Sequence, residues 1–286
     1  MADTTITVGE FQLTALSDAA TAPAPASALF PSVSAADWDA ARASYPWAFA
    51  GDNWNANFGC YLIRGGGRTI LMDTGIGDEG APYSAALGIP GRLMQELNAA
   101  GVSADDVDTV FMTHCHPDHV GWNTVRQGDQ FRPTFPSARY LLHRRDFEDF
   151  QQLERDGKLD PPYVEVAVAP LERAGVLDLI DGERELAPGI QLLHTPGHTM
   201  GHMSLLLQSG SAGVLLWGDV AHHPVQIAQP EESPIFDMDG GLAATTRGQV
   251  IDRIEAEGLT AAAGHFAAPG FGRVVRLEGK RYFQAL

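Results

Sequence analysis

The stretch Thr113–Val120 constrains the fold of this chain more than any other feature. It places three histidines and one aspartate within six residues, in the pattern HxHxDH from His114 to His119. The preceding residues, 107–112, are apolar and rich in β-branched side chains, which predicts a buried strand. The ligand-type side chains therefore follow the end of a strand, where they can converge instead of alternating between two faces of a sheet.

Imidazole and carboxylate groups are the ligands that zinc and neighbouring first-row metals take in proteins. Four such groups exceed what one open catalytic ion takes from a single loop, so the pattern predicts two ions. The alternative is a polar loop whose histidines form only local hydrogen bonds. That alternative suits one or two histidines better than HxHxDH behind a buried strand.

Bulk composition indicates a full hydrophobic core, and the rest of the sequence favours a single domain over residues 1–286. The chain is 44% hydrophobic, and its length alone would allow one large or two small domains. Two cysteines cannot form a disulfide framework, and neither a leader segment nor an apolar stretch of membrane-spanning length is visible. We therefore expect a cytoplasmic protein that does not enter a membrane.

The net charge makes a nucleic acid an unfavourable partner. The formal charge is −17 and the pI is near 4.8, so a polyanion would meet a repulsive field. The acidity otherwise serves solubility.

The segment 18–57 is expected to be an excursion that folds over the body of the protein, because its aromatic residues need burial. The sequence does not distinguish a lid over the site from a dimer arm. In front of it, Ile6–Ser17 is predicted to form a first strand.

Two predicted hairpins follow, and in each of them two apolar strands are joined by a glycine-containing turn and end at an Asp. Residues 58–64 and 68–72 flank three glycines and end at Asp73, and residues 203–207 and 213–217 end at Asp219. This recurrence predicts two similar halves. Asp73 is either a turn residue or a residue that orients a metal-bound histidine. Asp219, beside the other ligands, is the natural carboxylate to bridge two ions.

Two further histidines follow predicted strands. His198 lies between Gly197 and Gly201, which let the backbone turn sharply, and His265 follows an apolar segment at 259–263. Both are predicted metal ligands, whereas neighbouring His194 and His202 are not.

Three helices are predicted, at 92–100, around Phe147–Leu153 and at 242–257. The acidic residues of the second, which include Asp146, are expected to form a solvated face. Cys115, between two ligands, is expected to act as a small buried hydrophobe.

Taken together, HxHxDH, a glycine-flanked His, a strand-end Asp and a final strand-end His resemble the metallo-β-lactamase fold superfamily from Phe58 onward. The resemblance implies an α/β protein with a four-layered αββα sandwich. It implies one ion held by His114, His116 and His198, a second held by Asp118, His119 and His265, and Asp219 bridging them. It also implies two divalent ions, zinc first, with manganese, cobalt or iron as options, and a homodimer.

Within that superfamily, the residues around Asp219 are more similar to methyl parathion hydrolases and dinuclear quorum-quenching lactonases than to true zinc β-lactamases, which carry a Cys there. Some of these lactonases have a Tyr three residues after the bridging Asp, where this chain has His222. The side chains near the motifs that are predicted to contact the substrate are Trp54, Trp122, His222 and Phe266.

The predicted activity is hydrolysis of a small neutral ester, first a lactone and with a phosphotriester as a side substrate. Two ions sharing a water would generate a hydroxide nucleophile, and Asp118 could pass its proton to the leaving group. The alternatives are a thioester hydrolase of glyoxalase II type, a mononuclear iron persulfide dioxygenase, a nuclease, which the charge disfavours, and a metal-stabilised binding module.

Overall fold

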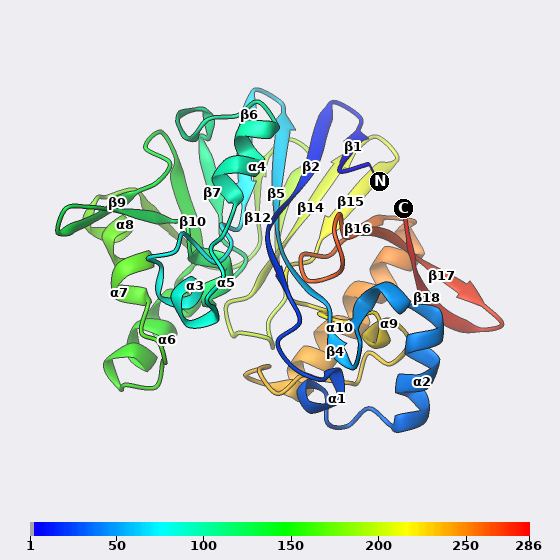
Figure 1. Ribbon diagram of the computed structural model, residues 1–286. Coiled ribbons are helices and arrows are strands. Elements are labelled where there is room, and N and C mark those ends of the chain that lie inside the picture. The colour runs from blue at the N-terminus through cyan, green and yellow to red at the C-terminus, as the bar shows by residue number, and fades with distance from the viewer. Residues whose placement is uncertain (1–2) are drawn as a thin grey trace. The chain divides into compact units, whose positions relative to one another are not determined.

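The computed structural model of the chain describes residues 3–286. These residues form two compact units. We call Thr4–Ala19 with Phe58–Gly182 the N-terminal unit, and Ala20–Asn57 with Glu183–Leu286 the C-terminal unit. Each unit is built around a seven-stranded sheet (Figure 1). The single domain predicted for residues 1–286 stays a prediction.

The sheet of the N-terminal unit has the strand order β1-β2-β5-β6-β7-β10-β11. Its strands are β1 (Thr5–Val8), β2 (Phe11–Thr21), β5 (Ala56–Gly65), β6 (Arg68–Met72), β7 (Thr109–Phe111), β10 (Arg139–His143) and β11 (Leu177–Ile180). The unit also contains α3 (Pro82–Leu87), α4 (Leu93–Ala99), a 3₁₀ turn (Ala104–Asp106), α5 (Pro117–Val120), α6 (Arg144–Arg155), α7 (Val164–Ala167), α8 (Ala169–Arg173), and the small hairpin β8 (Thr124–Gln127) and β9 (Gln130–Pro133). The single strand expected at 6–17 is in fact the antiparallel pair β1–β2, because Gly9 turns the chain with a φ of 58°.

The sheet of the C-terminal unit has the strand order β12-β13-β14-β15-β16-β17-β18. Its strands are β12 (Arg184–Ala187), β13 (Ile190–His194), β14 (Met203–Ser209), β15 (Ala212–Leu216), β16 (Thr260–Ala262), β17 (Phe271–Leu277) and β18 (Lys280–Ala285). The remaining elements are α1 (Ala26–Leu29), α2 (Ala35–Ser44), a 3₁₀ turn (Pro46–Ala48), β3 (Phe49–Ala50), β4 (Asn53–Trp54), α9 (Val225–Ala228) and α10 (Gly240–Glu257).

The two units repeat one arrangement of three strands, as the paired hairpins predict. In the N-terminal unit β5 and β6 are antiparallel and β7 joins β6 in parallel. In the C-terminal unit β14 and β15 are antiparallel and β16 joins β15 in parallel. Both hairpins lie where the glycine turns were predicted. In each unit, polar loops therefore follow the second and third strands of this arrangement, which are β6 and β7 in one unit and β15 and β16 in the other.

Most of the excursion predicted at 18–57 contributes to the core of the C-terminal unit, whereas residues 18–21 are the end of β2. Its buried aromatic residues, which include Phe30, Trp38 and Trp54, pack in one apolar cluster with Trp217 and Ile251. Burial of these rings is the outcome that the sequence predicts, and the choice between a lid and a dimer arm stays open. No described helix has the length and apolar character to cross a membrane.

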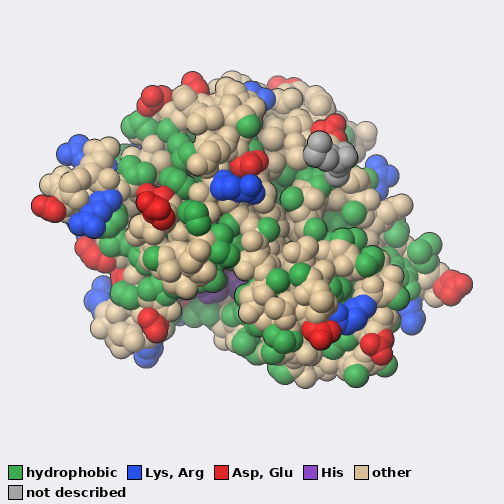
Figure 2. Space-filling view, viewed as in Figure 1, with side chains coloured by type: hydrophobic (Ala, Val, Ile, Leu, Met, Phe, Trp, Pro, Cys, Tyr) green, Lys and Arg blue, Asp and Glu red, His purple; other side chains and the backbone are tan. Residues whose placement is uncertain are grey.

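Charged side chains on the face seen in Figure 2 are scattered, with acidic and basic groups interspersed among polar and apolar ones. Such a surface fits an acidity that serves solubility.

Candidate metal centre

The HxHxDH loop brings its four ligand-type side chains together at the end of β7. The strand ends at Phe111, and α5 begins at Pro117. Proline is suited to the first position of a helix, because the backbone N–H it lacks would have no partner within the helix. The Nε2 atom of His114 lies 2.9 Å from Nδ1 of His116, and Nε2 of His119 lies 3.6 Å from Asp118. The centroids of the His114 and His119 rings are 4.1 Å apart. Two imidazole nitrogens this close to each other are suited to a shared cation.

Asp73 supports this loop from the end of β6. Its Oδ1 accepts a hydrogen bond from the backbone N–H of Thr113 at 2.7 Å, and its Oδ2 lies 2.9 Å from Nδ1 of His119. The residue adopts a left-handed backbone with a φ of 60°. Of the two roles that the sequence left open for Asp73, the contact with His119 favours orientation of that ring.

Asp146 anchors the same loop, and the prediction of a solvated acidic face was wrong for this residue. Asp146 is fully buried in α6, and its carboxylate accepts the backbone N–H of Cys115 at 3.0 Å. Tyr163 donates its hydroxyl to the Cys115 carbonyl at 2.8 Å. Burial raises the pKa of the Cys115 thiol well above its usual range, so Cys115 is the inert buried side chain that the sequence predicts.

In the C-terminal unit, three imidazoles converge on one carboxylate oxygen. Asp219 follows β15, and the histidines come from the loops after β13, β15 and β16. The Nε2 atoms lie within hydrogen-bonding distance of Asp219 Oδ2, at 3.2 Å for His198, 3.0 Å for His222 and 3.1 Å for His265. All four side chains are buried. This unit therefore brings together His198, Asp219 and His265 as predicted, and adds His222.

Burial and the neighbouring carboxylates compete in this cluster, and the net pKa shifts of two of its histidines have opposite signs. Burial disfavours the charged form of His198, but its hydrogen bonds to Asp219 and Asp237 outweigh burial and raise its pKa to about 9. Burial lowers the pKa of His222 to about 4, although Asp219 opposes the change. In the absence of a metal ion, His198 is therefore positively charged at pH 7 and His222 is neutral.

Two further side chains, His202 and Asp237, form hydrogen bonds with Asp219 and His198. His202 accepts the backbone N–H of Asp219 through Nε2 at 2.9 Å and contacts the Thr195 hydroxyl through Nδ1 at 2.8 Å. It therefore supports the loop that carries Asp219, and its exclusion from the ligands stays a prediction. Asp237 lies 2.8 Å from Nδ1 of His198. Sequence reasoning missed Asp237, because it lies 39 residues from His198 in a segment with no motif.

The predicted substrate contacts in the C-terminal unit have different surroundings. The Trp54 ring lies 5.7 Å from His265 and stacks at 6.5 Å on Phe236, which lies 4.8 Å from His222. Trp54 and His222 thus border the histidine cluster, with Phe236 as a neighbour that the sequence did not reveal. Phe266 packs in the apolar core 5.6 Å from Trp217, a position that favours a structural role.

Trp122, the predicted substrate contact in the N-terminal unit, is also buried. Its indole N–H donates to Asp18 at 3.0 Å, and the same carboxylate accepts the backbone N–H groups of Ile76 and Leu93. Trp122 therefore belongs to a buried network that holds three segments of this unit together, which again favours a structural role.

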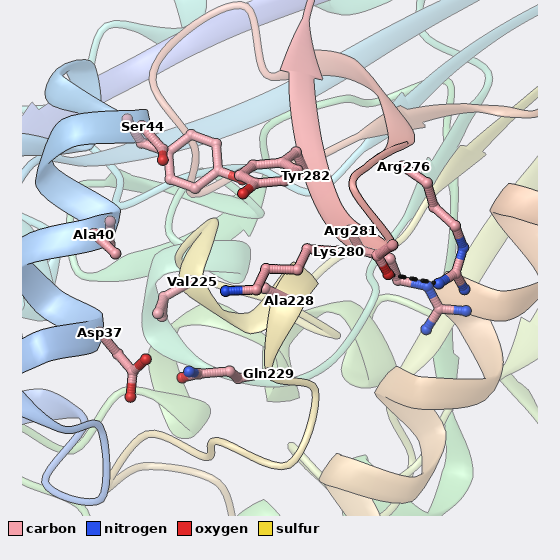
Figure 3. Close-up of a pocket in the computed structure, with 13 residues that line it drawn as sticks. Asp37, Ala40, Ser44, Val225, Ala228, Gln229, Arg276, Lys280, Arg281 and Tyr282 are labelled. Carbon is pink, nitrogen blue, oxygen red and sulfur yellow. Dashed lines mark hydrogen bonds between the residues drawn. The ribbon is translucent and has the colours of Figure 1, made fainter.

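A pocket of about 420 Å³ in the C-terminal unit lies between α2, α9 and the β17–β18 hairpin (Figure 3). Lys280 reaches across it toward α2. Arg276 and Arg281 instead donate hydrogen bonds to Glu255. Among the described residues that line this pocket, none belongs to the predicted site. The pocket is therefore separate from the histidine cluster.

Sequence comparison identifies the family. The model of the metallo-beta-lactamase superfamily matches residues 60–265. This chain belongs to that superfamily. The relatives include an N-acyl homoserine lactonase of Bacillus sp, 28% identical over 201 residues, with 65% of this chain and 72% of the relative covered. N-acyl homoserine lactonase AiiB of Agrobacterium fabrum is 29% identical, with 59% of this chain and 65% of the relative covered.

Solved structures share the fold of this chain. The hydrolase AbOPH of the beta lactamase superfamily has a TM-score of 0.82 at 24% identity, over 99% of this chain and 96% of that one. AidC, a dizinc quorum-quenching lactonase, has a TM-score of 0.83 at 21% identity, over 100% and 99% of the two chains. The predicted metallo-β-lactamase fold, a mixed α/β fold with two large sheets, and the predicted class of metal-dependent hydrolase are confirmed.

Proposed function

We propose that this superfamily member is a dinuclear metal-dependent lactonase that hydrolyses the ester bond of a small neutral lactone. The observation that carries the proposal is the convergence of three imidazole Nε2 atoms, within 3.0–3.2 Å, on one oxygen of Asp219. A divalent cation among these groups would accept the lone pairs of the imidazole nitrogens and offset the negative charge of Asp219. The lactonase relatives support the substrate class.

The histidines of both units are prepared to bind a metal through Nε2. In His119, His198 and His265 the Nδ1 atom faces an oxygen acceptor, namely a carboxylate oxygen of Asp73, a carboxylate oxygen of Asp237 and the backbone carbonyl of Asn57, at 2.9, 2.8 and 2.8 Å. A neutral imidazole that donates from Nδ1 keeps the lone pair on Nε2 for a metal. The donor set therefore fits divalent first-row ions, with zinc as the first choice.

The ligand assignment is the one that the family resemblance implies. We assign His114, His116 and His198 to one ion, Asp118, His119 and His265 to the other, and Asp219 to a bridging position. When bound, two such ions supply a hydroxide nucleophile at neutral pH and polarise the ester carbonyl. Such chemistry needs no serine or cysteine nucleophile, and Cys115 is buried.

Side chains of the site would then orient the substrate and move protons. The side chain of Asp118 is partly exposed, at 14%, so its carboxylate would be accessible to hold a proton and donate it to the leaving alkoxide of a substrate. His222 is neutral at pH 7 and buried beside Phe236. The rings of Trp54 and Phe236 offer an apolar wall for the substrate.

A panel of substrates separates this proposal from its alternatives. The panel contains N-acyl homoserine lactones, simple γ-lactones, p-nitrophenyl esters, a paraoxon-like triester and a glutathione thioester, each with zinc, manganese or cobalt. We expect lactones to give the highest kcat/KM and about two metal equivalents per chain. Preference for the thioester supports the glyoxalase II type of activity, and one tightly bound iron supports the oxygenase.

Substitution of Asp219 tests the bridging role directly. Asp219→Asn is expected to lower kcat for the lactone by at least about 100-fold and to reduce the metal content, because the shared anionic ligand is lost. The matched control is Asp181→Asn, which removes an exposed carboxylate that pairs with Arg144 on the surface. Full lactonase activity in Asp219→Asn would refute the proposal. The predicted homodimer stays a prediction, to be tested by light scattering.

A further inference from the structure

The segment between α9 and α10 carries a carboxylate that reaches back to a candidate metal ligand. The side chain of Asp237 is fully buried, and its Oδ1 lies 2.8 Å from Nδ1 of His198. The other ring nitrogen of His198, Nε2, lies 3.2 Å from Asp219. The imidazole is therefore held between two carboxylates, and each of its nitrogens faces one of them.

A buried arginine fastens this segment. Arg247 of α10 donates from Nη2 to Asp237 Oδ2 at 3.0 Å and from Nε to the Val220 carbonyl at 2.6 Å. Its Nη1 donates to the carbonyls of Pro230 and Glu232 at 2.8 and 2.7 Å. A guanidinium group without exposed surface requires such pairing, because an unpaired buried charge is strongly unfavourable. Arg247 thus ties the segment to the chain that follows Asp219.

We propose that Asp237 is a positioning residue that keeps the proton of His198 on Nδ1, so that Nε2 is presented to the metal, and that Arg247 fixes Asp237 for this purpose. This inference rests on the proposed metal-dependent function. A neutral imidazole carries one N–H, and the hydrogen bond made by that N–H decides which nitrogen is free to ligate.

The N-terminal unit uses an equivalent arrangement, which strengthens the inference. There Asp73 faces Nδ1 of His119 at 2.9 Å and is itself held by the backbone N–H of Thr113 at 2.7 Å. In the C-terminal unit the fixing group is the Arg247 guanidinium instead of a backbone amide. Both carboxylates use one oxygen for the histidine and the other for the group that holds them, although no sequence motif relates the two.

A purely structural role for Asp237 predicts different behaviour. If Asp237 served only to neutralise Arg247, its loss would lower stability without a specific effect on metal binding. If it positions His198, its loss changes the affinity for zinc and the kcat of the loaded enzyme, with a smaller effect on KM. The two roles can therefore be separated by measuring zinc affinity and stability on the same variants.

The first test uses the wild-type protein and needs no variant. Nitrogen NMR of the zinc-loaded protein should show His198 protonated at Nδ1 and bound to zinc through Nε2. Zinc bound through Nδ1 of His198, or an N–H on Nε2, would overturn the proposal. A wild-type protein that binds no zinc would instead refute the proposed function, so the two failures are distinguishable.

The second test compares Asp237→Asn with Asp239→Asn. Asp239 lies two residues away and caps α10 by accepting the backbone N–H of Leu242 at 2.9 Å, a role that Asn also fills. Competition with a chromophoric chelator should show zinc binding weakened by about 10–100-fold in Asp237→Asn and unchanged in Asp239→Asn. Equal zinc affinity in wild type and in folded Asp237→Asn would refute the positioning role.

A third variant covers the case in which Asp237→Asn fails to fold because Arg247 loses its counter-charge. Asp237→Asn combined with Arg247→Met removes both charges together. If this double variant folds, the proposal expects the same loss of zinc affinity as in the single variant. Normal zinc affinity in the double variant would show that Asp237 only balances the charge of Arg247.

Discussion

Replacement of His223 should change how the stability of this protein depends on pH. His223 is fully buried, and its ring lies 6.0 Å from Phe30, 5.2 Å from Trp38 and 5.0 Å from Phe49, measured between centroids. Its Nδ1 accepts the backbone N–H of Val225 at 3.2 Å. An imidazole enclosed by three aromatic rings cannot be solvated when it is charged.

The size of the effect follows from the pKa of this ring. Burial, and to a lesser degree the positive charge of Arg42, lowers the pKa of His223 to about 3, whereas the unfolded chain titrates near about 6.5. Below that pH the unfolded chain binds a proton that the folded chain excludes. The stability is therefore complete above about pH 6.5 and is lost as the pH falls toward 3. At pH 5 the loss relative to pH 8 is about 2 kcal/mol.

The assay is urea unfolding of wild type and His223→Asn at pH 8 and pH 5, with a chelator present so that metal binding does not contribute. Asn preserves an acceptor for the Val225 N–H but does not titrate, so its own packing cost applies at both pH values. The free energy of unfolding of wild type should fall by about 2 kcal/mol more than that of the variant between pH 8 and pH 5. Equal losses in the two proteins would refute the reasoning.

The remaining predictions concern the two loops that carry the histidines. Asp146→Ala should lower the free energy of unfolding by about 1–3 kcal/mol, measured with urea, because the buried Cys115 N–H loses its acceptor; no change would show that another group accepts it. Gly197→Ala should lower both zinc affinity and melting temperature, since Gly197 has a φ of 132° and a Cβ would lie 2.3 Å from the Ala243 nitrogen. Its control, Gly248→Ala in α10, where a Cβ meets nothing within 4 Å, should stabilise by about 0.5–1 kcal/mol.

Local patterns in the sequence determined much of the site. HxHxDH, the glycine-flanked His198, and Asp219 and His265 after apolar strands could be recognised because ligand type and strand end are both encoded within a few residues. The paired glycine hairpins likewise predicted two similar halves, which the strand pairing confirms. How these residues divide between two metal ions stays a prediction.

Only the tertiary structure revealed the groups that hold these ligands in place. The sequence pattern places Asp146 on a solvated helix face. In the structure, α6 packs so that the Asp146 carboxylate accepts the Cys115 N–H. Asp237 and Arg247 carry no local signal, because their roles depend on where the α9–α10 segment and α10 lie relative to His198. Sequence spacing encodes side chains that share one loop, whereas hydrogen bonds between distant segments exist only once the chain has packed.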